Sequence, residues 1–207
     1  MSRFAPLMIL AMVAASLSGC ASTEFVSAWK APLDGPIQFQ GKRVAAIVVT
    51  ANESIRRVAE DSLAREISAR GAQGTAGYRL VSGEALKDQD KAKQTLKEAN
   101  IQGAVVMRVV SNQQEVSYSP GTAWYNGNYY GSFWGYWGYS WPAVYDPGYL
   151  STDTVVLVET LVYSVVQDKL LWAGYSKTTN PSEVPKFVKE LSAAAAKEMK
   201  KAGFIVQ

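Results

Sequence analysis

Short apolar runs and four-residue repeats divide the chain after residue 40 into strands and helices. Residues 44–49 form the continuous apolar run VAAIVV, which predicts a strand buried on both faces. Thr50 and Glu53 have the spacing of a capping box, in which two side chains satisfy free backbone amides at the start of a helix. We therefore expect a helix from there to Arg70, ended by Gly71. Its core face would carry apolar residues spaced by four, namely Ile55, Ala59, Leu63 and Ile67.

Three more elements are expected before the middle of the chain. Residues 78–81 predict a second short strand, and residues 84–99 predict a more polar helix. Residues 101–110 are again apolar and predict a third, buried strand, which continues toward Tyr118 as a more exposed ribbon. Strands that alternate with helices in this way favour parallel pairing.

A hairpin and a final helix are expected after residue 150. Residues 154–166 are rich in β-branched side chains, and residues 169–178 would return as their antiparallel partner after a turn at 167–168. Ser182 is placed to cap the helix, and Pro185 is tolerated in its first turn. The core face of this helix would consist of Val184, Phe187, Val188, Leu191, Ala195 and Met199.

The order of these elements predicts the fold class. Gly203 would end the last helix, and residues 204–206 would add a short edge strand. The order is then β-α-β-α-β, an aromatic loop, and β-β-α-β, which predicts an α/β fold with a mixed sheet covered by helices. We expect one domain over residues 41–207, with an insertion at about 119–150.

The first twenty residues indicate the cellular compartment. A short basic start, an apolar stretch and Leu17-Ser18-Gly19-Cys20 resemble the signal and lipobox of bacterial lipoproteins, with residues 1–19 as the signal peptide. The resemblance implies that Cys20, the only cysteine of the chain, carries a diacylglycerol and an acyl chain such as palmitate. Ala21 in place of an aspartate implies the outer membrane, with the domain on its periplasmic face. Residues 20–40 would form a lipidated tether.

Composition excludes several chemistries. The chain has no histidine, which rules out Ser-His-Asp catalysis and histidine-ligated metal sites, and we expect no cofactor or metal. The net charge of +3 is too small to indicate a nucleic-acid partner. Glu115 and Glu159 are the only acids suggestively placed for a carboxylate pair, and we expect them to be exposed or ion-paired instead. The protein is therefore expected not to be an enzyme.

The segment between the two long strands holds the candidate binding residues. Residues 131–141, GSFWGYWGYSW, are more than half aromatic, and the only charge between residues 116 and 152 is Asp146. Four interpretations remain open: a protein-binding surface, a contact with the membrane interface, stacking on the sugar rings of the cell wall, or a low-complexity insert. The binding candidates are Trp124, Tyr130, Trp134, Tyr136, Trp137, Tyr139 and Trp141.

Two stretches carry a family resemblance. Residues 56–71, RRVAEDSLAREISARG, and residues 169–176, KLLWAGYS, are similar to bacterial lipoproteins of a domain-of-unknown-function family. The order of strands also resembles that of penicillin-binding-protein activator lipoproteins and of the curli-secretion lipoprotein. The resemblance implies an accessory component of the cell envelope that contacts other proteins and uses no catalytic residue. The alternative is a protein that binds or modifies cell-wall glycan through the aromatic loop, with peptidoglycan as its partner.

Two local expectations concern these same stretches. Arg56 with Glu60, and Arg57 with Asp61, are spaced to form ion pairs on an exposed helix surface. Such a solvated, self-paired face needs no partner. Trp172 is expected to be a core aromatic on the returning strand.

Overall fold

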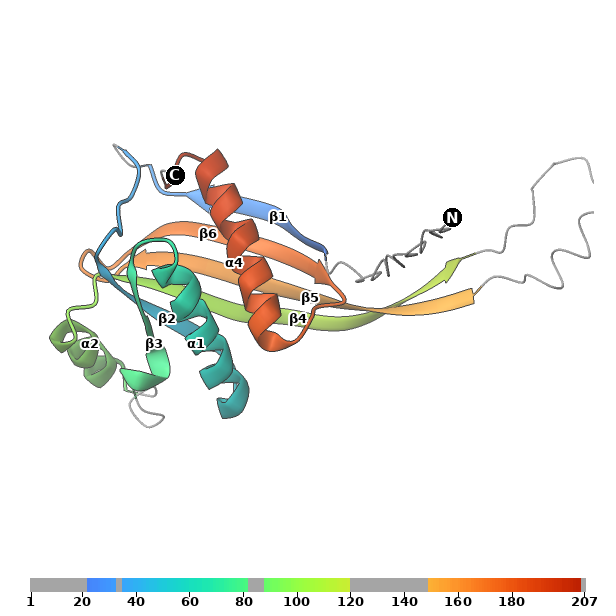
Figure 1. The fold of residues 1–207 in the computed structure, drawn as a ribbon, viewed down its shortest axis with the longest axis horizontal. Coiled ribbons are helices and arrows are strands. Elements are labelled where there is room, and N and C mark those ends of the chain that lie inside the picture. The colour runs from blue at the N-terminus through green and yellow to red at the C-terminus, as the bar shows by residue number, and fades with distance from the viewer. Residues whose placement is uncertain (1–21, 33–34, 82–87, 120–148, 206–207) are drawn as a thin grey trace, which may run out of the picture.

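The chain folds into one six-stranded sheet with helices on both of its faces. The computed structural model describes residues 22–32, 35–81, 88–119 and 149–205 (Figure 1). The mixed α/β fold expected from the sequence is confirmed. The described elements are β1 Ser22–Lys30, β2 Arg43–Val49, α1 Glu53–Ser68, β3 Gln73–Ala76, the 3-10 helix η1 Gly77–Arg79, α2 Gln89–Glu98, β4 Gly103–Ser119, β5 Tyr149–Ser164, β6 Lys169–Thr179 and α4 Val184–Lys201.

The sheet has a parallel half and an antiparallel half. Its strand order is β1-β6-β5-β4-β2-β3. Strand β2 pairs in parallel with β3 and β4, whereas β4, β5, β6 and β1 follow one another as antiparallel neighbours. The parallel pairs come from the alternating β-α-β part of the chain, and the long antiparallel pair β5–β6 is the expected hairpin. Both patterns of pairing therefore agree with the sequence analysis.

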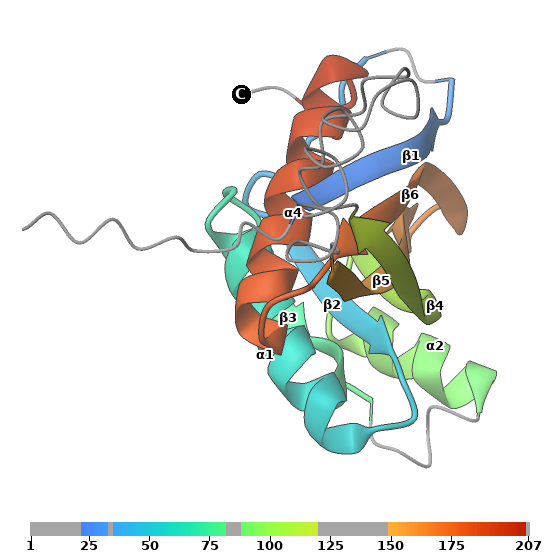
Figure 2. The same cartoon turned by 90° about the vertical axis from the view of Figure 1, so that its right-hand side faces the viewer.

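Helices α1 and α4 cover one face of the sheet, and α2 covers one end of the other face (Figure 2). The alternation of side chains along β2 explains how both faces are filled. Val44 and Ala46 pack into the cluster beneath α1 and α4, while Ala45 between them packs with Ile101 and Ala104 on the side of α2. The strand is thus buried on both faces, as its continuous apolar run predicts.

The start of α1 differs from the predicted capping box. Asn52 is the N-cap residue, and its Oδ1 accepts a hydrogen bond of 3.0 Å from the backbone N–H of Ile55. Thr50 instead accepts a bond from the N–H of Asn52. Asparagine is at least as good a cap as threonine, and its extended backbone suits that position. The helix ends near the predicted place, and Gly71 has the left-handed φ of 89°.

The second strand lies earlier in the chain than predicted. Strand β3 spans Gln73–Ala76, and η1, Gly77–Arg79, takes up the first two residues of the stretch 78–81 that was expected to be a strand. The strand contains Gly74 because a Cβ at that position would overlap the carbonyl oxygen of Ala64 in α1. A four-residue strand of small and polar side chains produces no apolar run, so the sequence pattern pointed to the apolar residues that follow it.

The expected tether is part of the sheet, and that expectation was wrong. Residues 22–30 form edge strand β1, which pairs with β6 from Ser22 opposite Thr179 to Lys30 opposite Trp172. Phe25 packs edge-on against the Trp172 ring, with ring centroids 5.7 Å apart. Edge strands have one unpaired side and often one exposed face, so β1 lacks the apolar pattern of a buried strand.

The end of the chain also departs from the prediction. Glu183, and not Ser182, is the N-cap of α4, with Pro185 in the first turn as expected. Gly203 has a φ of 64° and ends the helix as predicted. Phe204 and Ile205 form no strand. Phe204 buries its side chain, and its backbone carbonyl accepts a hydrogen bond from the N–H of Ile37.

Candidate functional site

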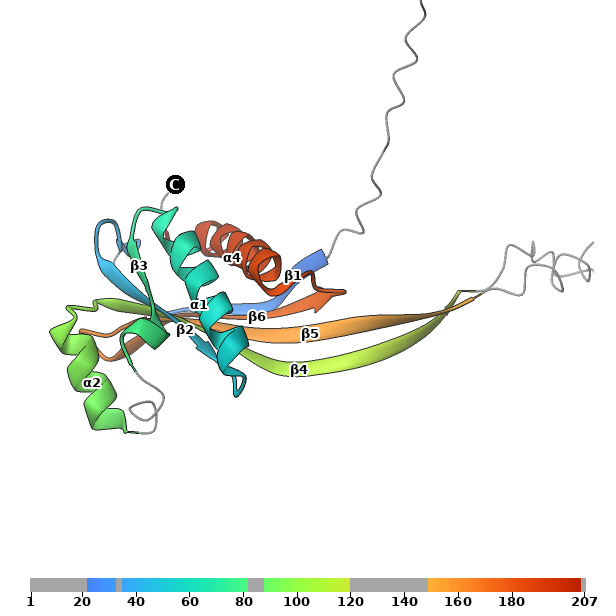
Figure 3. The ribbon, with the colours of Figure 1, turned by 60° about the horizontal axis from the view of Figure 1, so that its bottom comes forward.

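Strands β4 and β5 extend beyond the rest of the sheet as a two-stranded ribbon (Figure 3). The last residue of β6, Thr179, pairs with Val155 of β5. From Thr154 to Tyr149, β5 pairs only with β4, and the register closes with Ser119 opposite Tyr149. At about 3.4 Å for each residue, the ribbon carries its tip roughly 20 Å past the end of β6.

The first described residue of the chain, Ser22, lies at the base of this ribbon. Ser22 is in register with Thr179, which is in register with Val155. Cys20 lies outside the described residues, but it is only two residues before Ser22 in the sequence. Two extended residues span at most about 7 Å. The chain therefore leaves the sheet toward Cys20 at the same end from which the ribbon projects.

The ribbon has a fixed base and an apolar surface. The Asn180 side chain donates a hydrogen bond of 2.8 Å to Asp153 and accepts one of 2.9 Å from the N–H of Thr154. Val116 and Leu150 are 67 % and 71 % exposed. They lie on the same face, because Val116 pairs with Thr152 and the residues of one face alternate. Val116 and Leu150 thus form a small exposed apolar patch near the tip.

The aromatic binding candidates lie between the two ends of the ribbon. The structure places the insertion after Ser119 and before Tyr149, at the tip of the ribbon. The two strands expected to flank the insertion are therefore paired neighbours in the sheet. The candidate residues themselves lie outside the described residues: Trp124, Tyr130, Trp134, Tyr136, Trp137, Tyr139 and Trp141.

The two glutamates considered for catalysis do not form a pair. Glu159 is ion-paired with Arg108 at 2.9 Å, and Glu115 lies 3.8 Å from the ammonium group of Lys177. Glu115 is opposite Asp153, six residues from Glu159 along β5. This spacing separates the two glutamates by roughly 20 Å along the strands, which is too far for joint acid-base chemistry on one bond.

The charged face of α1 is arranged differently from the prediction. Arg56 and Arg57 both pair with Glu53, at 3.0 and 2.8 Å, and Asp61 pairs with Arg79. Glu60 is only 2 % exposed. The expected Arg57–Asp61 pair does not form because η1 brings Arg79 next to Asp61. The expected Arg56–Glu60 pair does not form because the Glu60 side chain points into the protein.

Glu60 connects three elements of the fold. Its carboxylate accepts a hydrogen bond of 3.1 Å from the N–H of Val48 in β2 and one of 2.6 Å from the N–H of Tyr78 in η1. Burial raises the pKa of Glu60, although these hydrogen bonds and the nearby Arg56 act in the opposite direction. Glu60 is therefore a structural carboxylate of the core.

Trp172 is a core residue, as the sequence predicts. It is fully buried beneath α4 and packs with Phe204 and Ala195. A Cβ on Gly174 would overlap the indole ring, so the glycine in KLLWAGYS makes room for the tryptophan. The glycine two residues after the tryptophan is thus explained by packing.

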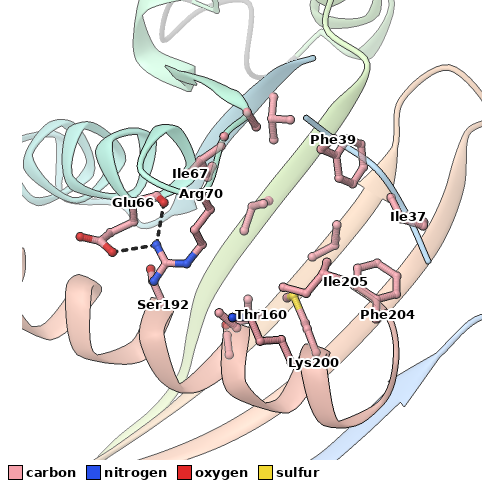
Figure 4. Close-up of a pocket in the computed structure, with 18 of the residues that line it drawn as sticks. Ile37, Phe39, Glu66, Ile67, Arg70, Thr160, Ser192, Lys200, Phe204 and Ile205 are labelled. Carbon is pink, nitrogen blue, oxygen red and sulfur yellow. Dashed lines mark hydrogen bonds and ion pairs between the residues drawn. The ribbon is translucent and has the colours of Figure 1, made fainter. Parts of the chain in front are cut away.

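A cavity of about 1210 Å³ lies between the C-terminal halves of α1 and α4, above the sheet (Figure 4). Typical small-molecule pockets have volumes of about 300–1,000 Å³. Strands β2, β4 and β5 form the floor, and residues 37–40 close one side. The sequence analysis did not identify this cavity. The available signal was the run of four alanines at 193–196, which leaves space beside the helix.

The described ranges contain neither a candidate metal centre nor a candidate membrane span. Across these residues, no group of three or more acidic, histidine or cysteine side chains is arranged to hold a metal ion. No helix in this part of the chain has both the length and the apolar character needed to cross a bilayer.

Comparison with known proteins finds similarity to solved structures alone. No family model and no curated protein matches the sequence. Among solved structures, a PelC dodecamer from Paraburkholderia phytofirmans is 14 % identical with a TM-score of 0.45, over 91 % of this chain and 100 % of that chain. Lipoprotein GNA1162 from Neisseria meningitidis is 11 % identical with a TM-score of 0.39, over 77 % of this chain and 99 % of that chain. One similar structure is thus a lipoprotein, and at these scores no role of either protein is transferred to this chain.

Proposed function

We propose that this chain is a lipid-anchored lipoprotein of the periplasmic face of the outer membrane, and that it acts as a non-catalytic accessory component of the envelope. It would bind a protein partner through the β4–β5 ribbon and the aromatic insertion at the tip. The observation that carries the proposal is the position of β1. The proposed anchor at Cys20 and the ribbon leave the same end of one rigid sheet.

This arrangement makes the anchor and the ribbon act on the same region of the envelope. A lipid within about 7 Å of Ser22 would hold the base of the ribbon at the membrane surface. Anchoring converts an encounter with another membrane-held protein into a nearly intramolecular event, with an effective concentration in the mM range. A ribbon with a modest affinity of its own would then suffice. The resemblance to penicillin-binding-protein activator lipoproteins implies the same kind of accessory role.

The chemistry of the ribbon supports protein contact. Tyrosine and tryptophan provide large, rigid contact areas at low entropic cost and are enriched at binding hot spots. Val116 and Leu150 are exposed apolar residues on one face of the ribbon, near the insertion. Between Glu115 and Asp153, which face each other at the start of the ribbon, Asp146 is the only charged residue in the sequence, so few charges would have to be desolvated in a contact there.

A cross-linking experiment in cells tests the proposal. A photoreactive residue is introduced at Leu150 of the lipidated protein, and separately at Val166 as the matched control. Both are exposed apolar residues, 71 % and 74 %; Leu150 lies near the start of β5, and Val166 lies in the turn that follows its other end. We expect a discrete protein adduct from position 150 and none from 166. The adduct should disappear when Cys20→Ser removes the lipid site and when residues 120–148 are deleted.

Three results would contradict the proposal in different ways. Failure of Cys20 to incorporate labelled palmitate would remove the lipid anchor. Equal adducts from positions 150 and 166 would show that the ribbon is not the contact. If the ribbon cross-links only to phospholipid, the membrane replaces the protein as its partner. If residues 21–207 sediment with purified peptidoglycan sacculi and the deletion of residues 120–148 prevents this, cell-wall glycan is the partner.

A further inference from the structure

The cavity between α1 and α4 has separate polar and apolar sides. Figure 4 shows Glu66, Arg70, Ser192, Thr160 and Lys200 along one side of the cavity, with Ile67 as the one labelled apolar residue among them. The labelled residues on the other side are Ile37, Phe39, Phe204 and Ile205. Val105, Met107, Val162 and Met199 add apolar surface to the lining. Methionine side chains fill and adapt to irregular apolar volumes. A ligand that fits must therefore be apolar over most of its length and polar at one end.

Two buried hydroxyl groups on the polar side have no partner in the protein. Thr160 Oγ1 and Ser192 Oγ form no hydrogen bond within the described part of the chain, and these residues are 0 % and 8 % exposed. Both residues line the cavity. An unsatisfied buried hydroxyl is costly, so buried polar groups nearly always have a partner. Two such groups on the wall of one cavity indicate a polar group of a ligand.

The charge at the cavity identifies the sign of that polar group. Four basic residues line the cavity, namely Arg70, Lys197, Lys200 and Lys201, against one acidic residue, Glu66. Arg70 is paired with Glu66 at 2.8 Å, and Lys201 is paired with Glu198. Lys197 and Lys200 form no ion pair with any residue that the structure describes. Two uncompensated ammonium groups therefore remain available to an anion.

We infer that this cavity binds a long-chain fatty acid, with its carboxylate among Thr160, Ser192 and the lysines of α4 and its acyl chain among the apolar residues on the opposite side. The two hydroxyl groups donate hydrogen bonds to the carboxylate oxygens. Lys197 and Lys200 offset its negative charge. The acyl chain takes the volume between Phe39, Phe204 and the strand floor. This site lies apart from the ribbon and does not depend on the proposed function.

The lysines also have an ordinary structural role that the experiment must separate. Lys200 and Lys201 lie in the last turn of α4, where positive charge stabilises the C-terminal end of the helix dipole. That role predicts a change in stability and no change in ligand binding. The measurements below therefore report affinity and thermal stability on the same variants.

The first measurement uses residues 21–207, which retain every described helix and strand. Isothermal titration calorimetry and native mass spectrometry follow the binding of decanoate, dodecanoate and tetradecanoate below their micelle concentrations. We expect one bound molecule per chain, and an affinity that rises by up to about fourfold for each added methylene group. Dodecanoate should bind at least about tenfold more tightly than 1-dodecanol, which has the same chain without the charge.

Three variants assign the binding to this cavity. Thr160→Val with Ser192→Ala removes both hydroxyl groups without disturbing a hydrogen bond, so the fold should keep its stability while the preference for dodecanoate over 1-dodecanol is lost. Lys197→Gln with Lys200→Gln should weaken dodecanoate and leave 1-dodecanol unchanged. Ala196→Phe should weaken both ligands by reducing the cavity volume.

The matched control removes the same charge from the same helix. Lys186→Gln with Lys189→Gln alters two lysines of α4 that do not line the cavity, and dodecanoate affinity should not change. The inference is overturned if no fatty acid binds in a one-to-one ratio, if the control weakens binding as much as the cavity variants, or if dodecanoate and 1-dodecanol bind equally well. It is also overturned if Ala196→Phe changes only the oligomeric mass, because a second copy of the chain would then be the occupant.

Discussion

Substitution of Glu60 by alanine tests whether a single buried carboxylate connects the parallel half of the sheet to α1. The alanine variant removes both acceptor oxygens. The backbone N–H groups of Val48 and Tyr78, at 3.1 and 2.6 Å from those oxygens, then lose their partner. Glu60 is 2 % exposed, so water does not readily replace the carboxylate.

The expected loss of stability follows from these two contacts. Each buried donor left without an acceptor costs about 1–3 kcal/mol, so Glu60→Ala should lower the free energy of unfolding by about 2–6 kcal/mol. A domain of this size has roughly 5–15 kcal/mol in total. The Glu60→Gln variant keeps one acceptor oxygen and places an amide donor near the second N–H. It should lose about half as much, roughly 1–3 kcal/mol.

The dependence on pH provides an independent check. Burial raises the pKa of Glu60 from its ordinary value of 4.5, so the folded state favours the protonated side chain. The contribution of Glu60 to stability is then fully present below about pH 4.5 and is lost as the pH rises through the folded-state pKa. The difference in stability between the native chain and Glu60→Gln should therefore be largest in acid and decrease toward neutral pH.

Urea unfolding of residues 21–207, followed by circular dichroism at several pH values, measures both effects. The matched control is Glu66→Gln, a partly exposed glutamate of the same helix whose carboxylate pairs only with Arg70. That variant should change stability by no more than about 1 kcal/mol. The reasoning would be refuted if Glu60→Ala lowered the free energy of unfolding by less than about 1 kcal/mol. It would also be refuted if the difference in stability between the native chain and Glu60→Gln grew with rising pH.

Three further predictions concern packing and the insertion. Leu63→Ala should lower the free energy of unfolding by about 2–5 kcal/mol, because Leu63 of α1 is buried in the cluster that α1 shares with α4. Ile55→Ala, on the same helix but 42 % exposed, should change it by no more than about 0.5 kcal/mol. Equal losses in urea unfolding would contradict this packing. Gly74→Ala should abolish cooperative thermal unfolding because its Cβ overlaps the Ala64 carbonyl, and a native-like transition would show that α1 and β3 are not in that contact. Replacement of residues 120–148 by Asn-Gly should keep the thermal midpoint, since Ser119 and Tyr149 are directly opposed and suit a two-residue turn; a large fall would assign the insertion to the core.

Most regular elements could be predicted from the sequence because their signals are local. The apolar run at β2, the four-residue spacing in α1 and the β-branched hairpin β5–β6 each reflect which side of one element faces the core. Ile55 was wrongly assigned to the core face of α1: it lies in the first turn and is 42 % exposed, whereas Ala59, Leu63 and Ile67 are buried. Gly71 and Gly203 marked two helix ends through their need for a positive φ. The alternation of strands and helices then determined the mixed fold class.

The candidate site was only partly visible in the sequence. The aromatic insertion and its place between two long strands were recognised from composition and spacing. Its relation to Cys20 was not, because β1 is an edge strand whose pairing partner, β6, lies about 150 residues away in the chain. A strand of this kind is specified by the partner that it meets, and no local pattern marks it.

The sequence by itself determined most of the element types, the fold class, the lipobox pattern and the presence of an aromatic insertion. Only the tertiary structure decided that Glu60 is a buried acceptor, that the segment after Cys20 begins the sheet at the base of the ribbon, and that a cavity with unpaired hydroxyls opens between α1 and α4. The physical reason is the range of the interactions. Propensity and amphipathic period act within one element, whereas burial of a charge, pairing of an edge strand and the shape of a cavity depend on elements that are distant in the chain.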